Sequence, residues 1–128
     1  MLDLQRTTGT SIILISHDLG VVAQTCDKVA VMYRGRIVES AHTTELFSNI
    51  RHPYTRGLLN SIPSIDSDSE WLDAVPGRVP TIEEELPGCA FHPRCSYSQG
   101  LCSELLPELM NLNDQHLARC HFAKDLEL

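Results

Sequence analysis

Residues 11–18 read Ser-Ile-Ile-Leu-Ile-Ser-His-Asp, and this stretch decides the predicted fold. Its short apolar run is rich in β-branched isoleucine, which favours strands. An apolar run without alternation is typical of a strand that is covered on both faces, as in a parallel sheet. Asp18 can cap a following helix, and apolar residues recur at helical spacing from Leu19 to about Cys26. The stretch therefore predicts a strand followed directly by a helix.

The flanking residues extend this pattern on both sides. Residues 1–8 predict the end of a helix, which Gly9 terminates. After the central helix, residues 29–33 form a second apolar run, and residues 36–39 return as the other half of a hairpin after a glycine turn. Residues 11–40 are thus predicted to form β-α-β-β, the edge of an α/β domain.

This edge is too small to bury its own first strand. Residues 1–61 offer about three strands. A strand that is buried on both faces needs neighbouring strands and covering helices. We therefore expect the partners of residues 12–15 to come from a part of the protein that precedes Met1, or from another chain.

Three segments are predicted along the chain. Residues 1–61 form part of the α/β domain, and they include two further short helices that begin near Thr43 and at His52-Pro53-Tyr54. Residues 62–88 form a Pro-rich acidic linker. Residues 89–128 form a small, irregular extension that is rich in cysteine.

The charge is uneven along the chain. The net charge is −7. The residues up to Ser61 include six basic and five acidic residues and contribute +1, whereas those from Ile62 onward include four basic and twelve acidic residues and contribute −8. An acidic half without a basic stripe argues against nucleic acid as a partner. The sequence has no apolar run of about 18 residues that could span a membrane, and its first residues are too polar for a signal peptide. The cytoplasm is therefore the expected compartment.

His17 lies where the first predicted strand ends and the helix begins. In parallel α/β sheets the carboxyl ends of the strands form the ligand crevice, so a histidine there is well placed to meet a phosphate or a reacting water. Ser16, His17 and Asp18 do not form a catalytic triad, because three consecutive residues at a strand end cannot generally direct their side chains at one another. A histidine that is satisfied by a nearby carbonyl is the plainer alternative.

Two stretches, Thr10 to Val22 and Cys26 to Glu39, resemble the switch-histidine region of ABC ATPases. The strand, the histidine, the helix, the Asp27-Lys28 pair and the strand-Gly-strand hairpin occur in the same order. The resemblance implies that His17 contacts the γ-phosphate of ATP and helps to couple it to the attacking water, which an imidazole can do by donating to an anionic oxygen. Residues 52–59, His-Pro-Tyr-Thr-Arg-Gly-Leu-Leu, look like the segment that follows the ATPase core in oligopeptide and dipeptide importers.

Other parts of that family's catalytic site do not occur in this sequence. It has no Gly-x-x-x-x-Gly-Lys-Ser/Thr phosphate loop, no Leu-Ser-Gly-Gly-Gln-like signature and no apolar strand that ends in Asp-Glu. In the family these elements precede the segment that matches Met1. The resemblance therefore implies the C-terminal part of an ATP-binding subunit, in which only the complete subunit binds ATP and Mg²⁺. We expect the chain alone neither to bind ATP tightly nor to hydrolyse it.

The resemblance also implies partners. The complete subunit would power the import of dipeptides or oligopeptides together with transmembrane permease subunits and a second ATP-binding subunit. It would lie in the cytoplasm, on the inner face of the cell membrane. A different function is a stand-alone metal-binding accessory or regulatory module that docks on such ATPase subunits; a gene product without function is the third alternative.

Four of the five cysteines follow the pattern Cys89-x5-Cys95-x6-Cys102-x17-Cys120. Cytoplasmic thiols stay reduced, which favours metal binding over disulfides. Four thiolates suit zinc or a four-iron cluster, and the lack of a tight Cys-x2–4-Cys knuckle favours the cluster. Zinc, with His121 as a replacement ligand, and no metal at all are the alternatives. The stretch also resembles the C-terminal extension of importer ATPases, and for some of that group it implies a [4Fe-4S] cluster.

Overall fold

The computed structural model describes residues 2–62, 75–81, 83–113 and 115–128. Its elements are, in chain order, α1 (Leu2–Thr8), α2 (Leu19–Thr25), β1 (Lys28–Tyr33), β2 (Arg36–His42), α3 (Thr43–Ser48), α4 (Pro53–Asn60), the 3-10 helix η1 (His92–Arg94), α5 (Gly100–Glu104), β3 (Met110–Asn113) and β4 (His116–Ala118). The four helices predicted in the first segment are confirmed by α1 to α4. None of the helices in the described ranges has the length and apolarity that crossing a bilayer requires.

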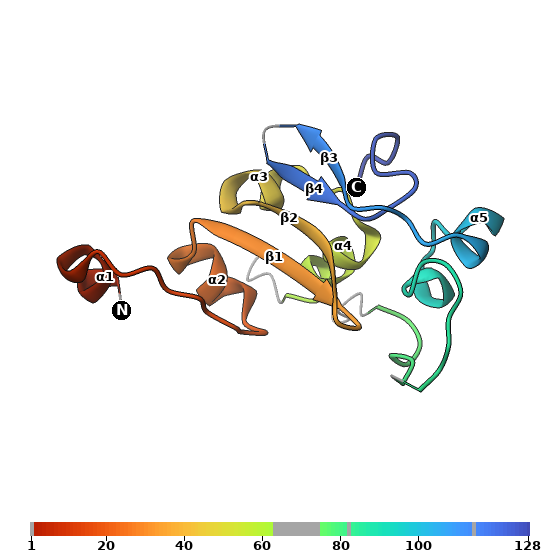
Figure 1. Ribbon diagram of the computed structural model, residues 1–128, viewed down its shortest axis with the longest axis horizontal. Coiled ribbons are helices and arrows are strands. Elements are labelled where there is room, and N and C mark those ends of the chain that lie inside the picture. Colours follow the sequence, from red (N-terminus) through yellow and green to blue (C-terminus); the bar gives the residue numbers. More distant parts are fainter. Residues whose placement is uncertain (1, 63–74, 82, 114) are drawn as a thin grey trace, which may run out of the picture.

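Four antiparallel strands form one sheet in the order β1-β2-β4-β3 (Figure 1). The β1–β2 hairpin agrees with the prediction. Its two turn residues, Arg34 and Gly35, have φ angles of 46° and 75°, and a turn with two positive φ angles matches the twist of the flanking strands. Side chains along β1 alternate between exposed and buried, so Val29, Val31 and Tyr33 face the core.

The other two strands come from the carboxyl end of the chain. β4 pairs with β2, with Ala118 opposite Glu39, and β3 pairs with β4. Just beyond β4, the amide of Arg119 donates to the carbonyl of Val38 at 2.8 Å. No strands were predicted in this part of the sequence. The result is a mixed helix and antiparallel-sheet fold rather than the parallel sheet that the apolar run suggested.

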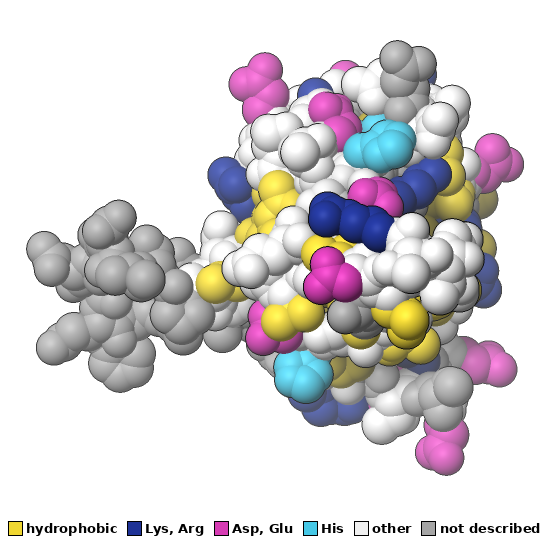
Figure 2. All heavy atoms as spheres, turned by 90° about the vertical axis from the view of Figure 1, so that its left-hand side faces the viewer, with side chains coloured by type: hydrophobic (Ala, Val, Ile, Leu, Met, Phe, Trp, Pro, Cys, Tyr) yellow, Lys and Arg dark blue, Asp and Glu magenta, His cyan; other side chains and the backbone are white. Residues whose placement is uncertain are grey.

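The strand predicted over residues 11–16 is not formed. These residues have neither helical nor strand structure, and the side chains of Ile13 and Ile15 are each 93% exposed. A strand of a parallel sheet needs a hydrogen-bonded neighbour, but within the described part of the chain β1 is an edge strand that pairs only with β2. Hydrophobic side chains lie exposed among charged ones on the face that carries α1 (Figure 2). The β-α-β-β prediction is therefore wrong in its first element and correct in the other three.

One hydrophobic core contains residues from both ends of the sequence. Val31 of β1 and Leu46 of α3 belong to it, and so does Phe91, which lies far along the chain. The Phe91 ring centroid lies 5.3 Å from that of Tyr33 and 5.4 Å from that of Tyr54, at inclined angles that aromatic pairs favour. The segment before η1 therefore packs on the β1–β2 hairpin. The linker predicted over residues 62–88 falls partly on residues 63–74 and 82, which are outside the described ranges.

Candidate functional site

His17 lies in the segment between α1 and α2, immediately before the helix cap. Asp18 caps α2 as predicted, since its Oδ1 accepts the amide hydrogen of Val21 at 3.0 Å. Ser16 Oγ accepts the amide hydrogen of Asp18, also at 3.0 Å. These two bonds orient the backbone on the C-terminal side of His17, and the His17 side chain is exposed. The histidine is therefore open to a ligand.

A pocket of about 330 Å³ lies beside His17. Its walls come from the segment before α2, from β1 and from Tyr54 and Leu58 of α4, and they are mostly apolar. Among the described lining residues, Lys28 carries the one formal charge and no carboxylate is present. His17 and Lys28 can both donate to an anion, but this lining holds no carboxylate ligand for magnesium.

The four cysteines of the C-terminal segment line a single cavity of about 20 Å³. Cys89 and Cys102 are neighbours, because the Cys89 amide donates to the Cys102 carbonyl at 2.8 Å. Cys95 ends η1, and Cys120 is brought in from the far end of the chain by β4. The sequence pattern predicted that these residues act together, and the fold does place them around one space.

The four cysteines are free thiols; Cys102 is buried, and the other three are half-buried. Burial raises the pKa of Cys89 and of Cys95 above the ordinary thiol value, and it raises the pKa of Cys120 to about 11. Burial disfavours the thiolate because the charged form loses its hydration. In this arrangement the thiols of Cys89, Cys95 and Cys120 are therefore protonated at neutral pH and are poor nucleophiles.

The arrangement does not by itself present a metal site. Within the described ranges, no group of three or more His, Cys, Asp or Glu side chains has the geometry to hold a metal ion. The cavity has room for about one water molecule. His121, the predicted alternative ligand, directs Nε2 at the Leu105 carbonyl at 2.8 Å, so that nitrogen donates a proton and is not a ligand.

Gly88 precedes the first of these cysteines and has a φ angle of 75°. A Cβ at this position would collide with the Cys102 carbonyl and lie 2.8 Å from the Ser103 carbonyl carbon. Gly88→Ala is therefore expected to lower the free energy of unfolding by about 2 kcal/mol or more, through backbone strain and this collision. Urea unfolding at neutral pH measures the change. Gly35→Ala is the matched control, since its φ is also 75° but a Cβ there meets no atom within 4 Å; an equal loss in both variants would rule out the collision.

His52 explains the His-Pro-Tyr motif. Its ring is 1% exposed, and its Nδ1 accepts the amide hydrogen of Tyr54 at 3.1 Å, so His52 is the N-cap of α4. Pro53 occupies the first turn, where its missing N–H costs nothing. The His52 ring also lines the four-cysteine cavity. A helix start was predicted at this position, but no role was predicted for the histidine. The signal in the sequence was a polar residue directly before a proline at a helix start.

The capping bond requires an unprotonated Nδ1, and burial lowers the pKa of His52 from 6.5 to about 4. Because the folded state then binds fewer protons than the unfolded state, the stability from this group is fully present above pH 6.5. It is lost as the pH falls toward 4, by roughly 3 kcal/mol in all. Urea unfolding between pH 7 and pH 4 measures this loss. His52→Asn has no titrating group here and should show a shallower decline; parallel declines would contradict the assignment to His52.

The chain matches the family model described as the oligopeptide/dipeptide transporter, C-terminal region, over residues 38–102. It is 46% identical over 121 residues to the probable peptide ABC transporter ATP-binding protein y4tR of Sinorhizobium fredii. The matched region covers 94% of this chain and 36% of that protein. It is 46% identical over 120 residues to the oligopeptide transport ATP-binding protein AppD of Bacillus subtilis, covering 94% of this chain and 37% of AppD.

The similarity extends to a dipeptide transport protein as well. The chain is 37% identical over 123 residues to the dipeptide transport ATP-binding protein DppD of Caldanaerobacter subterraneus, covering 96% of this chain and 38% of that protein. The chain thus spans a little over a third of the length of these relatives. Because the family model matches just over half of its residues, the chain belongs to the oligopeptide/dipeptide transporter family and contains that family's C-terminal region.

Proposed function

We propose that this chain is the C-terminal part of an ATP-binding subunit that powers dipeptide or oligopeptide import. The observation that carries the proposal is the similarity over 94% of the chain to peptide transport ATP-binding proteins. The exposed position of His17 beside a pocket supports a role in sensing the γ-phosphate. The complete subunit would bind ATP and Mg²⁺ through a phosphate loop and a strand-terminal Asp-Glu pair, neither of which occurs in this sequence.

Transmembrane permease subunits and a second ATP-binding subunit are the proposed partners. The exposed isoleucines at 13 and 15 support only the placement of this chain within a larger subunit, because such apolar surface is stabilised when another part of the subunit covers it. The assembled subunit would lie at the cytoplasmic face of the membrane. The stand-alone metal-binding module is the weaker alternative, because the described residues contain no group arranged to hold a metal.

A chimera of Bacillus subtilis AppD tests this function. The matching 120 residues of AppD are replaced by this chain, and oligopeptide uptake is measured in cells that lack AppD. Uptake should return with the chimera and not with AppD that lacks those residues. A chimera that is made in normal amounts but restores no uptake would contradict the proposed function.

The [4Fe-4S] cluster stays a prediction of the cysteine spacing, supported only by the convergence of the four cysteines on one cavity. Iron, zinc and acid-labile sulfide are measured in the chain purified without oxygen. About four irons and four sulfides per chain would fit a cluster held by four cysteines. About one zinc per chain would replace the cluster by a tetrahedral site, and the absence of both metals would leave a buried thiol cluster.

A further inference from the structure

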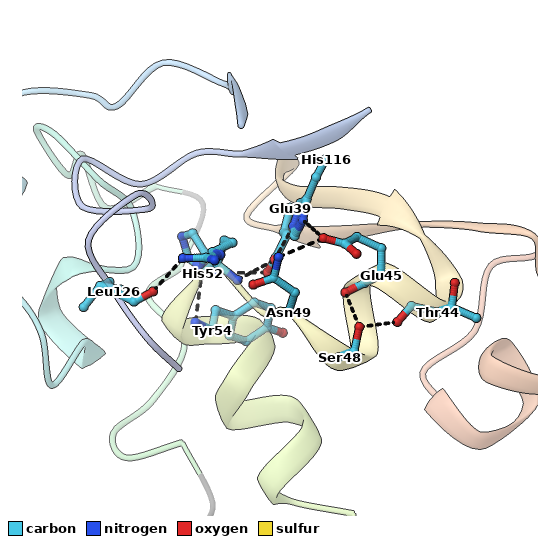
Figure 3. A network of polar contacts seen from close by, with 10 residues as sticks. Glu39, Thr44, Glu45, Ser48, Asn49, His52, Tyr54, His116 and Leu126 are labelled. Atoms are coloured by element: carbon cyan, nitrogen blue, oxygen red, sulfur yellow. Dashed lines mark hydrogen bonds and ion pairs between the residues drawn. The ribbon is translucent and has the colours of Figure 1, made fainter. Parts of the chain in front are cut away.

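Glu39 is a fully buried carboxylate in β2 that joins distant parts of the fold (Figure 3). Its Oε1 accepts the amide hydrogen of Arg51 at 2.6 Å, and its Oε2 accepts that of His52 at 3.1 Å. Nε2 of His116, the first residue of β4, lies 2.9 Å from Glu39 Oε1. Both side chains are 0% exposed. A carboxylate in this environment is stable only with donors and an opposite charge.

The other ring nitrogen of His116 faces a second carboxylate. Its Nδ1 lies 3.5 Å from Glu45 Oε1 and makes no hydrogen bond in the described structure. Carboxylate oxygens only accept, so a neutral imidazole would direct a lone pair at one of the two carboxylates. A ring that is protonated on both nitrogens presents a proton to each of them.

We propose that His116 is held as an imidazolium between Glu39 and Glu45, and that this charge cluster is a pH-sensitive latch that fastens the C-terminal hairpin to the sheet. The inference concerns contacts within this chain and does not depend on the transport function. Glu39 and His116 are 77 residues apart in sequence, and the bond between them spans the β2–β4 junction.

The groups on α3 keep Glu45 ionised beside the ring. Asn49 Nδ2 donates to Glu45 Oε1 at 2.8 Å. This bond, followed by the interaction with His116 and a smaller one with Asn113, lowers the pKa of Glu45 below its ordinary value. The carboxylate is therefore negative at neutral pH and favours a proton on the ring nitrogen that faces it.

The other cations near the latch do not neutralise its carboxylates. Arg51 and Lys124 line a hollow of about 160 Å³ that His116 also borders. The Arg51 guanidinium donates to the Leu126 carbonyl at 3.1 Å. Within the described residues, His116 is the one cationic side chain paired with Glu39. Removing its proton therefore leaves a buried carboxylate without an opposite charge.

The latch holds the strand that precedes Cys120. β4 runs from His116 to Ala118, and Cys120 enters the four-cysteine cavity two residues later. A group whose charged form is favoured by folding stabilises the folded state at lower pH and loses this effect as the pH rises. The hairpin should therefore loosen on the alkaline side and expose the Cys120 thiol, whereas the His52 cap weakens on the acid side.

The charge state of His116 is tested directly by a long-range ¹H–¹⁵N spectrum of the full chain at pH 7. The expected result is a ring with both nitrogens protonated. A ring with one protonated and one unprotonated nitrogen would overturn the proposal. The ring signals of His116 are assigned as those that disappear in His116→Gln. If that variant does not fold, the signals of the other five histidines are assigned from single substitutions of each, and the remaining signals belong to His116.

Hydrogen exchange tests the latch. Between about pH 7 and about pH 9, the protection factor of the Arg119 amide, which donates to Val38 in β2, should fall at least about tenfold. The reference is the amide of Cys26, the C-cap of α2, which donates to the Val22 carbonyl. Glu45→Gln should abolish most of this fall, because the glutamine amide can donate to a neutral Nδ1. Glu85→Gln, which changes an exposed glutamate elsewhere in the chain, should keep the fall. An unchanged protection factor in the wild type, or an equal fall in Glu45→Gln, would refute the latch.

Discussion

Replacing His52 with alanine is expected to lower the free energy of unfolding by about 3 kcal/mol. The change removes the N-cap of α4, because the Tyr54 amide loses its acceptor. It also opens a cavity at a fully buried position whose ring lies 5.8 Å from that of Phe91, between ring centroids. The cap and the cavity contribute in the same direction, so this is the largest stability effect we expect from a single side chain of the motif.

His52→Asn separates the two contributions. An asparagine oxygen can accept the Tyr54 amide hydrogen, so the cap is kept while part of the ring volume is lost. In urea unfolding at pH 7, the free energy of unfolding of His52→Asn should be about 1 kcal/mol higher than that of His52→Ala. If both variants lose the same free energy, the capping role is wrong and only packing explains the motif.

Local signals in the sequence were sufficient for the β1–β2 hairpin and for α2. A two-residue turn that contains Gly35 lies between two apolar runs, and Asp18 stands directly before a helical pattern. In both cases the residues that decide the structure are within a few positions of one another. These elements therefore formed as predicted.

The C-terminal hairpin could not be predicted in the same way. β3 reads Met-Asn-Leu-Asn and β4 reads His-Leu-Ala, sequences with little strand preference. They become strands because β4 pairs with β2 and because His116 meets Glu39 across 77 residues. The opposite error occurred at residues 11–16, where a strongly strand-like run has no neighbour to pair with in the described part of the chain.

The candidate sites also differ in how far the sequence could predict them. Spacing alone grouped the four cysteines, and the fold brings them to one cavity. His17 was singled out by its position after the apolar run, and its role at a nucleotide stays a prediction. His116 acts through a contact 77 residues away, so only the structure reveals what it does. His52 acts through the local bond to Tyr54, for which the following proline was a signal in the sequence.

His17→Ala in the AppD chimera is expected to reduce the ATP turnover rate at least a hundredfold, to order of magnitude. The residue is proposed to donate to the γ-phosphate and to help position the attacking water, an interaction that strengthens as charge develops in the transition state. His17 is exposed and packs little in this chain, so its loss should leave folding intact. His42→Ala is the matched control, because His42 is an exposed histidine at the end of β2 without a side-chain capping bond.

The most direct test of the central claim is the steady-state ATP hydrolysis rate of the purified chimeric subunit, assembled with the rest of the AppD transport system. We predict hydrolysis that is stimulated in the assembled transporter, unchanged by His42→Ala and lost with His17→Ala. A chimera that folds and assembles but hydrolyses no ATP would contradict the assignment of this chain to the C-terminal part of an ATP-binding subunit. Equal hydrolysis with and without His17 would contradict the role proposed for that residue.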